Sequence, residues 1–248
     1  MSKIALLSLA AVLFVAVAAN ACPMINGQTC LFYGGDFDPN DPNANGLTNE
    51  TDSYVNGDPY GSAIYQNFVY DGNSPITGLF TNNFIASNSI PKNGYWEIRS
   101  GVSEGNGGTL VASGTNPLIN APTGLNAFGY PIYTNAVTFS PLVLNAGTYW
   151  LAVVPECNPT CGGNSRSFNA NTFGLNSIGT QINDEQFLNS SDFGANFTNA
   201  NNEGVFQTFS SGVLTSGTGS GIPEPSSLIL LGSGLVAAAG VVRRRLTR

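Results

Sequence analysis

Side chains that carry oxygen ligands are concentrated between Asp36 and Asp52. Counting from Asp41, the stretch follows the D-x-N-x-N-G-x5-D spacing of a calcium-binding loop, with Asp52 in place of the usual terminal Glu. The predicted ligands, hard oxygens of the kind that calcium prefers, are Asp41, Asn43, Asn45, Asn49, Asp52 and the backbone carbonyl of Leu47. The first five positions hold one carboxylate and no flanking helix pattern is evident, so a connecting loop of turn-forming Asn and Asp residues is the alternative.

The chain contains no histidine, which limits the catalytic chemistry open to it. Ser-His-Asp and Cys-His nucleophile systems are excluded, as are histidine-ligated zinc and iron sites. Carboxylate acid–base chemistry, as in a glycosidase, remains. The candidate carboxylates are Glu97, Glu104, Glu156, Asp184, Glu185 and Asp192. Because no spacing pairs them, we expect solvated surface charges, no catalytic residues and no enzyme activity.

The N-terminus has the three parts of a secretory signal peptide. Lys3 supplies positive charge, residues 4–18 are apolar, and Ala19-Asn20-Ala21 fits an A-x-A cleavage site. We therefore expect residues 1–21 to be removed and Cys22 to begin the exported chain. A lipid-modified Cys22 is the alternative, although Ala19 stands where such signals usually carry a branched apolar residue.

Four cysteines form two local pairs in the sequence, Cys22 with Cys30 and Cys157 with Cys161. An even number of cysteines in an exported chain favours disulfides. Of the three possible connectivities, local pairing is the simplest and is our prediction. A four-cysteine zinc site is the alternative, but the spacing is not that of paired C-x-x-C knuckles.

Basic and acidic residues are distributed unevenly. Between Cys22 and Pro225 the only basic residues are Lys92, Arg99 and Arg166, whereas all fifteen acidic residues lie there, for a formal net charge of −12. Such a surface repels phosphate, which argues against nucleic acid as a partner. It suits solubility outside the cell, or divalent cations.

The elements that must position these residues read as short strands. Predicted strands occupy residues 29–33, 63–69, 77–85, 94–100, 109–112, 136–139, 148–154, 171–175 and 205–209. They are rich in β-branched and aromatic residues, and Asn-Gly pairs between them suit tight turns. With no helical periodicity, the pattern predicts an all-β ectodomain over residues 22–209, a β-sandwich or jelly roll.

Two segments carry the tryptophans. Alternation of Trp96 with Ile98 predicts one buried face and a wet face that presents Glu97 and Arg99. Residues 144–153 predict a turn that leads into a nearly continuous apolar strand at the centre of a sheet. Trp96 and Trp150 could line a sugar-binding face, but we predict core positions, where large aromatics in a sandwich more often lie.

The end of the chain joins physically different segments. Residues 210–221, rich in Gly, Ser and Thr, predict a flexible linker. Pro223-Glu224-Pro225 holds the backbone extended, and the uncharged residues 226–242 predict a transmembrane helix. Arg243, Arg244 and Arg245 begin a basic tail, 243–248, and predict stop-transfer charges on the cytoplasmic side.

In this order, residues 222–248 resemble the PEP-CTERM sorting signal of exported bacterial proteins. The resemblance implies recognition and cleavage by the membrane protease exosortase. The strands around Trp96 and Trp150 also resemble segments of exported PEP-CTERM proteins of unassigned function, which supports a sandwich but names no substrate. The same tail is sometimes labelled the C-terminal domain of ice-binding proteins, but this chain has no regular T-x-T ladder.

These patterns predict an exported protein that its C-terminal helix holds in the inner membrane until exosortase cuts it. The released body would then reside at the cell surface or in extracellular matrix, with extracellular polysaccharide as a candidate partner. Its expected role is structural or adhesive, and calcium is the one cofactor that the sequence suggests. The alternatives are a calcium-assisted carbohydrate-binding module and, third, a glycosidase.

Overall fold

The computed structural model describes residues 22–23, 25–55, 58–85, 90–157, 167–180, 185–189, 197–200 and 208–216. For residues 52–55, 58–60 and 189 it describes the backbone alone. These ranges belong to one compact unit, Ala21–Gly217. The predicted signal peptide (1–21), the Pro223-Glu224-Pro225 motif, the span 226–242 and the arginines 243–245 lie outside the described residues.

The described part of the chain is built from strands. They are β1 (Thr29–Tyr33), β2 (Gly46–Thr48), β3 (Glu50–Val55), β4 (Asp58–Tyr70), β5 (Ile76–Ile85), β6 (Asn93–Ser100), β7 (Thr109–Pro117), β8 (Ile119–Ala127), β9 (Tyr130–Leu142), β10 (Gly147–Pro155), β11 (Ser167–Thr172), β12 (Phe187–Asn189), β13 (Thr198–Asn199), β14 (Thr208–Phe209) and β15 (Ser211–Thr215). Their ladders are antiparallel. Among the described residues we find no helix with the length and apolarity needed to span a membrane. The all-β prediction is confirmed.

One sheet is organised around β5. On one side β5 pairs with β9 along its length, and on the other it pairs first with β15 and then with β11. β1 lies beyond β15, β8 lies beyond β9, and β2 and β14 pair with β11. Every residue of β5 is buried, as expected for a strand covered on both faces.

The second sheet is organised around β10, which lies between β4 and β6. β7 follows β6, β12 and β13 follow β4, and β3 also pairs with β4. Leu151 and Val153 point into the space between the sheets, whereas Trp150, Ala152 and Val154 point to the outer face, and all five are buried. Burial on both faces explains the nearly continuous apolar sequence of β10 and confirms the prediction of a central strand.

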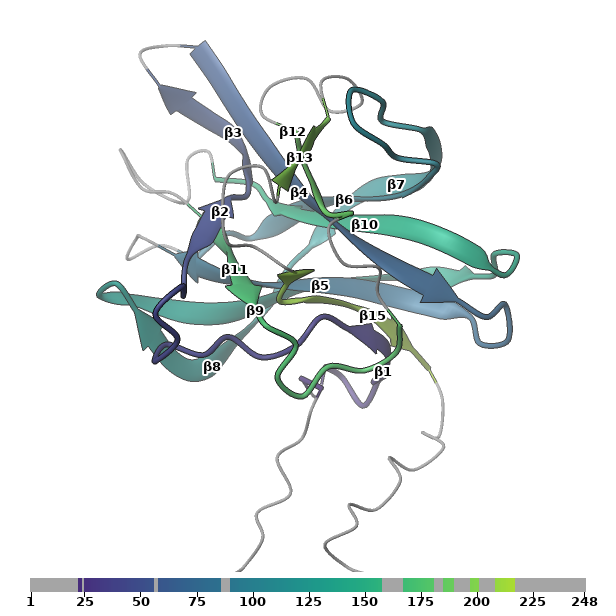
Figure 1. The fold of residues 1–248 in the computed structure, drawn as a ribbon, viewed down its shortest axis with the longest axis horizontal. Helices are drawn as coiled ribbons and strands as arrows, with labels where there is room; N and C mark the ends of the chain where they lie inside the picture. Colours follow the sequence, from purple (N-terminus) through teal and green to yellow (C-terminus); the bar gives the residue numbers. More distant parts are fainter. Residues whose placement is uncertain are drawn as a thin grey trace, which may run out of the picture. The chain divides into compact units, whose positions relative to one another are not determined.

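The two sheets share a core that fills the space between them. Phe32, Leu79 and Val213 enter it from the β5 sheet, and Phe68 and Ile98 enter it from the β10 sheet. Figure 1 shows β4, β6 and β10 in the upper layer, with β5, β9 and β15 in the lower layer. The architecture is therefore sandwich-like, as predicted.

Each sheet also buries residues on its outer face. The outer face of the β10 sheet packs Tyr65 and Trp150 against Phe187 and Phe197. The outer face of the β5 sheet carries a cluster of Cys22, Ile25, Tyr33, Phe80, Ala136 and Leu214. Because connecting segments cover both outer faces, strand positions that alternation alone assigns to solvent are interior here.

Both tryptophans occupy core positions, as predicted. Trp96 stacks on Phe139 with ring centroids 4.1 Å apart, and its Nε1 donates to Asn116 Oδ1 at 2.7 Å. Trp150 donates from Nε1 to the backbone carbonyl of Glu185 at 2.7 Å. Each indole is buried and has its polar atom satisfied, so neither presents a face to a sugar.

The C-terminal boundary of the domain differs from the prediction. We expected a linker from Ser210 onward, but Ser211–Thr215 form β15, which pairs with β1 and β5. Val213 and Leu214 point to opposite faces of the sheet, and both are fully buried. The linker prediction is therefore wrong for residues 210–215. The small residues around this apolar pair fit closely between the neighbouring strands, and the compact unit extends to Gly217.

Candidate functional site

Strand alternation places a group of polar side chains inside the protein, on the outer face of the β10 sheet. On β6, Trp96 and Ile98 point into the inter-sheet core, so Glu97 and Arg99 point to the opposite face. Tyr65 of β4 meets them there. Glu97 is 0% exposed and Arg99 is 6% exposed. The predicted wet face is therefore wrong, because a second layer of chain covers it.

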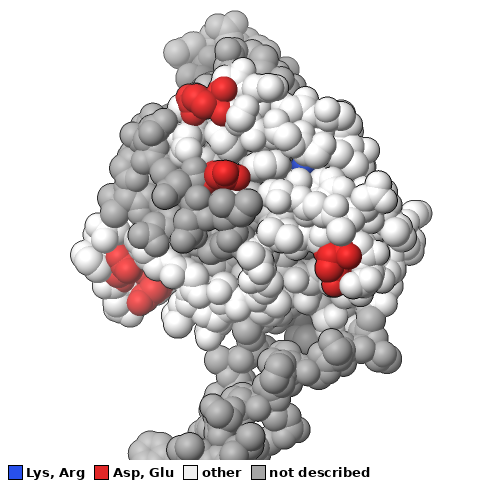
Figure 2. All heavy atoms as spheres, turned by 45° about the vertical axis from the view of Figure 1, so that its right-hand side comes forward, with Lys and Arg blue, Asp and Glu red and all other residues white. Residues whose placement is uncertain are grey.

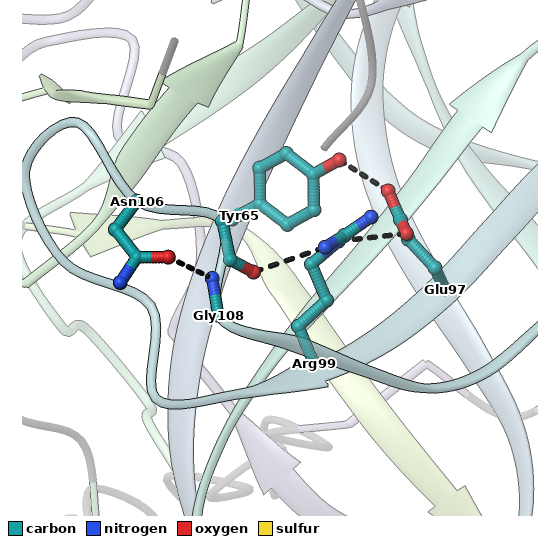
Figure 3. Close-up of polar contacts among 6 residues, drawn as sticks. Tyr65, Glu97, Arg99, Asn106 and Gly108 are labelled. Carbon is teal, nitrogen blue, oxygen red and sulfur yellow. Dashed lines mark hydrogen bonds and ion pairs between the residues drawn. The ribbon is translucent and has the colours of Figure 1, made fainter. Parts of the chain in front are cut away.

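Glu97 and Arg99 form an ion pair that Tyr65 completes. Arg99 Nε donates to Glu97 Oε2 at 2.8 Å, and the Tyr65 hydroxyl donates to Glu97 Oε1. Arg99 Nη1 also donates to the backbone carbonyl of Gly107 at 3.0 Å. Figure 3 shows the two donors reaching separate oxygens of the carboxylate. Both carboxylate oxygens thus have a donor, the condition under which a buried charge is tolerated.

A tight turn brings the Gly107 carbonyl onto Arg99. Ser103 and Asn106 exchange two backbone hydrogen bonds, and Asn106 Oδ1 accepts from the backbone N–H of Gly108 at 2.9 Å (Figure 3). Gly108 has a φ of +63°, and a Cβ there would lie 2.1 Å from a backbone oxygen of β6. This position needs glycine for both its conformation and its space.

The rings of Phe197 and Tyr65 lie beside the ion pair. The guanidinium carbon of Arg99 lies 5.5 Å from the centroid of the Phe197 ring, within the range of a cation–π contact. The Tyr65 and Phe197 rings lie 4.7 Å apart at 47°. The backbone carbonyl of Phe197 accepts from Gly105 N at 2.7 Å, which ties this segment to the turn.

Burial controls the titration of the phenols beside the ion pair. Burial raises the pKa of Tyr65 far above its ordinary value, and the neighbouring Glu97 carboxylate raises it further. Burial and the Glu97 charge also raise the pKa of Tyr95. Tyr65 therefore keeps its proton at neutral pH and acts as a hydrogen-bond donor. The arrangement suits an anchor that holds strands and turn together.

The other carboxylates singled out in the sequence lie in different surroundings. Glu104 is exposed and accepts from the backbone N–H of Asn199 at 2.7 Å through Oε2. Glu156 follows the end of β10, and Glu185 contributes its backbone carbonyl to Trp150. Asp184 and Asp192 lie outside the described residues.

The first part of the predicted calcium loop forms turns. Asp41 Oδ1 accepts from Asn43 N at 2.7 Å, and Asn45 Oδ1 accepts from Gly46 N at 2.8 Å. The Asp41 bond, two residues on, is that of an Asx turn, whereas the Asn45 bond reaches only the next residue. Leu47 follows in β2, where it pairs with Asn169 of β11.

The later ligands of the predicted loop enter the sheets. Asn49 is fully buried, and its Nδ2 donates to Val153 O at 2.9 Å while its Oδ1 accepts from Ile64 N at 3.3 Å. The side chain of Asp52 lies outside the described residues. In the described ranges no three His, Cys, Asp or Glu side chains are grouped to hold a metal ion. Calcium binding by the predicted ligands Asp41, Asn43, Asn45, Leu47, Asn49 and Asp52 stays a prediction, although the Asn49 amide hydrogen-bonds to the backbones of Val153 and Ile64.

One predicted disulfide is present. Cys22 and Cys30 are bonded, with their Cα atoms 6.0 Å apart, and the bridge joins the start of the described chain to β1. The second predicted bridge joins Cys157 to Cys161. Cys161 lies outside the described residues, so this pairing stays a prediction.

The described body is thus an all-β, sandwich-like domain whose most unusual feature is an enclosed ion pair. Residues 221–245 match the family model of the PEP-CTERM protein-sorting motif. The match confirms the resemblance seen in the sequence and indicates an exported protein with a C-terminal sorting signal. No curated protein and no solved structure matches the chain.

Proposed function

We propose that this protein is a structural or adhesive component of the cell surface or of exopolysaccharide, and that exosortase sorts it through its tail. The observation that carries the proposal is the match of residues 221–245 to the PEP-CTERM protein-sorting motif. On this account the signal peptide (1–21) starts export and the tail decides where the exported body is released. The body acts by its shape and surface, without an enzyme activity.

The proposed tail works as a temporary anchor. Residues 226–242 would span about 25 Å as a helix, somewhat short of a bilayer core of about 30 Å. Arginine side chains at 243–245 reach the interface and make up the difference. As a flexible chain, the residues between β15 and Pro223 would have a typical reach of about 13–16 Å, which would give a protease access to the Pro-Glu-Pro segment.

The body suits exposure outside the cell. Its buried ion pair, its filled core and the Cys22–Cys30 bridge all favour a rigid domain. Figure 2 shows acidic side chains as separate patches on one face, where almost no basic side chain reaches the surface. A net negative charge keeps exported copies soluble and apart until they reach their destination.

Cell fractionation tests the proposal. The full chain would be expressed in a bacterial host that carries an exosortase and in the same host without it. We expect the body in the surface or medium fraction in the first host and in the membrane fraction in the second. Replacing Pro223, Glu224 and Pro225 by alanine should retain the protein in membranes of both hosts, whereas Ser220→Ala, as a matched control, should sort normally. Identical fractionation in the two hosts would contradict the proposal.

A further inference from the structure

The turn between β8 and β9 has an unusual residue for its conformation. The two strands pair up to Ala127 and Tyr130, which leaves Phe128 and Gly129 as the connecting residues. Their φ angles are +54° and +82°. Two-residue hairpin turns with positive φ at both positions favour Asn-Gly, because most side chains are strained there. Phe128 therefore occupies a position that the backbone alone would give to Asn.

The strained residue is also the most exposed aromatic ring of the hairpin. Phe128 is 62% exposed, Tyr130 is 41% exposed and Leu125 is 38% exposed. Phe84, which is buried in β5, meets the Phe128 ring in an edge contact with centroids 5.6 Å apart at 85°. The contact fixes the ring and leaves most of its surface open. Backbone strain of this kind is often found at functional sites, and here it positions an exposed aromatic side chain.

The β8–β9 hairpin itself is uncharged, whereas the segment that packs beside its tip through Phe37 carries Asp36, Asp38 and Asp41. Residues 105–155, which include the whole of β7, β8, β9 and β10, contain no Asp, Glu, Lys or Arg. The rest of the exported part carries a net charge of −12. An anionic polysaccharide or an anionic lipid surface would be repelled by the body and would find no basic residue on the hairpin. An uncharged ligand meets no such repulsion.

We propose that the tip of the β8–β9 hairpin binds an uncharged polysaccharide, with sugar rings stacked on Phe128 and Tyr130. The C–H face of a pyranose is apolar and packs on an aromatic ring. This inference rests on the proposed function, for which it names the contact surface and the class of partner. On this account the strained conformation of Phe128 serves to present its ring to the sugar.

The Phe128→Asn substitution separates recognition from folding. Asn suits a positive φ followed by Gly, so the variant should keep or raise the melting temperature of the protein. Binding should fall about tenfold or more, the loss typical of truncating an aromatic anchor. Val143→Asn is the matched control, because Val143 is 67% exposed and lies outside the hairpin. It should change neither quantity.

The measurement is binding of the detergent-solubilised full chain to immobilised cellulose, curdlan, amylose and mannan, with alginate as the acidic comparison. We expect retention on at least one uncharged polysaccharide, none on alginate, and loss with Phe128→Asn. The inference is overturned by equal binding of that variant, by a lowered melting temperature that accounts for its loss of binding, or by binding to none of the uncharged polymers. Sorting is scored separately by fractionation, so this inference can fail while the proposed function stands.

Discussion

Glu97 Oε2 and Arg99 Nε lie 2.8 Å apart. The two residues are two positions apart on β6, so their side chains leave the same face of the strand and turn toward each other. Both are inside the protein, and the Tyr65 hydroxyl and the Gly107 carbonyl satisfy further atoms of the pair. Each charge therefore offsets most of the cost of burying the other. Removing one partner leaves a buried charge, which is far more costly than removing both.

The first prediction concerns this asymmetry. Arg99→Met should lower the free energy of unfolding by about 3–5 kcal/mol, because Glu97 then stays buried without a counter-charge. The double variant Glu97→Gln/Arg99→Met should lose clearly less than the single variant, since no uncompensated charge remains. Urea unfolding of the three proteins measures this difference. A double variant less stable than Arg99→Met would show that the pair is not coupled in this way.

The second prediction concerns alkaline pH. Burial raises the pKa of Tyr33 and of Tyr65 above the ordinary value, so both stay protonated in the folded protein after tyrosines of the unfolded chain begin to ionise near pH 10. Stability is therefore complete below about pH 10 and is lost as pH rises above it. Each such group should contribute a slope of about 1.4 kcal/mol per pH unit.

Tyr65→Phe tests this slope. The variant should be less stable at pH 7 by about 1.5–3 kcal/mol, because it loses a hydrogen bond to a charged carboxylate. Between pH 10 and 11, however, its free energy of unfolding should fall less steeply than that of the wild type. Urea unfolding at several pH values gives both quantities. Parallel curves for the two proteins above pH 10 would rule out the assigned role of Tyr65.

The third prediction concerns the turn that covers the ion pair. Gly105 and Gly108 both have positive φ, but a Cβ at Gly105 would meet no atom within 4 Å, whereas one at Gly108 would lie 2.1 Å from the Ser100 carbonyl oxygen. Gly105→Ala should cost about 1–2 kcal/mol from backbone strain alone. Gly108→Ala should cost measurably more, because strain and a clash with backbone add. Thermal unfolding compares them, and equal losses would contradict the geometry.

The fourth prediction concerns the N-terminal bridge. Replacing Cys22 and Cys30 together by alanine should lower the free energy of unfolding by about 2.5 kcal/mol, the loop-entropy value for a closed segment of this length. Chemical denaturation of the double variant and the wild type under oxidising conditions provides the comparison. An unchanged midpoint would mean that the segment before β1 adds nothing to global stability.

Several features could be predicted from the sequence because they depend on local pattern. The strand at residues 29–33, the central strand that became β10, the core positions of Trp96 and Trp150, and the Cys22–Cys30 bridge all follow from alternation, apolar runs or close spacing. The sorting tail is recognisable for the same reason, since proline, apolar span and arginines stand in a fixed order.

Other features depend on contacts between distant segments. The sequence predicts that Glu97 and Arg99 are exposed to solvent, because nothing in β6 shows that Phe197 and the turn before β7 will cover them. β8 was missed because Pro122 and Gly124 interrupt it, which an edge strand with a bulge tolerates. β15 was missed because Ser and Gly surround its two apolar residues.

One clue to the β8–β9 hairpin was available in the sequence. Phe128-Gly129 ends in a glycine and is followed by the β-rich stretch that became β9, at the place where Asn-Gly is the ordinary choice for a two-residue turn. An aromatic residue before a turn glycine is a departure from local preference. Its meaning becomes clear only when the exposure and the positive φ of Phe128 are known together.

The intact mass of the protein recovered from the cell surface tests the central claim most directly. In the exosortase-containing host we predict a chain that begins at Cys22 and ends at or near the Pro223-Glu224-Pro225 segment, without the apolar span and the arginines. In the host without exosortase we predict a membrane-bound chain that begins at Cys22 and still carries Arg248. Recovery of a surface form that retains Arg248 in the exosortase-containing host would contradict the account.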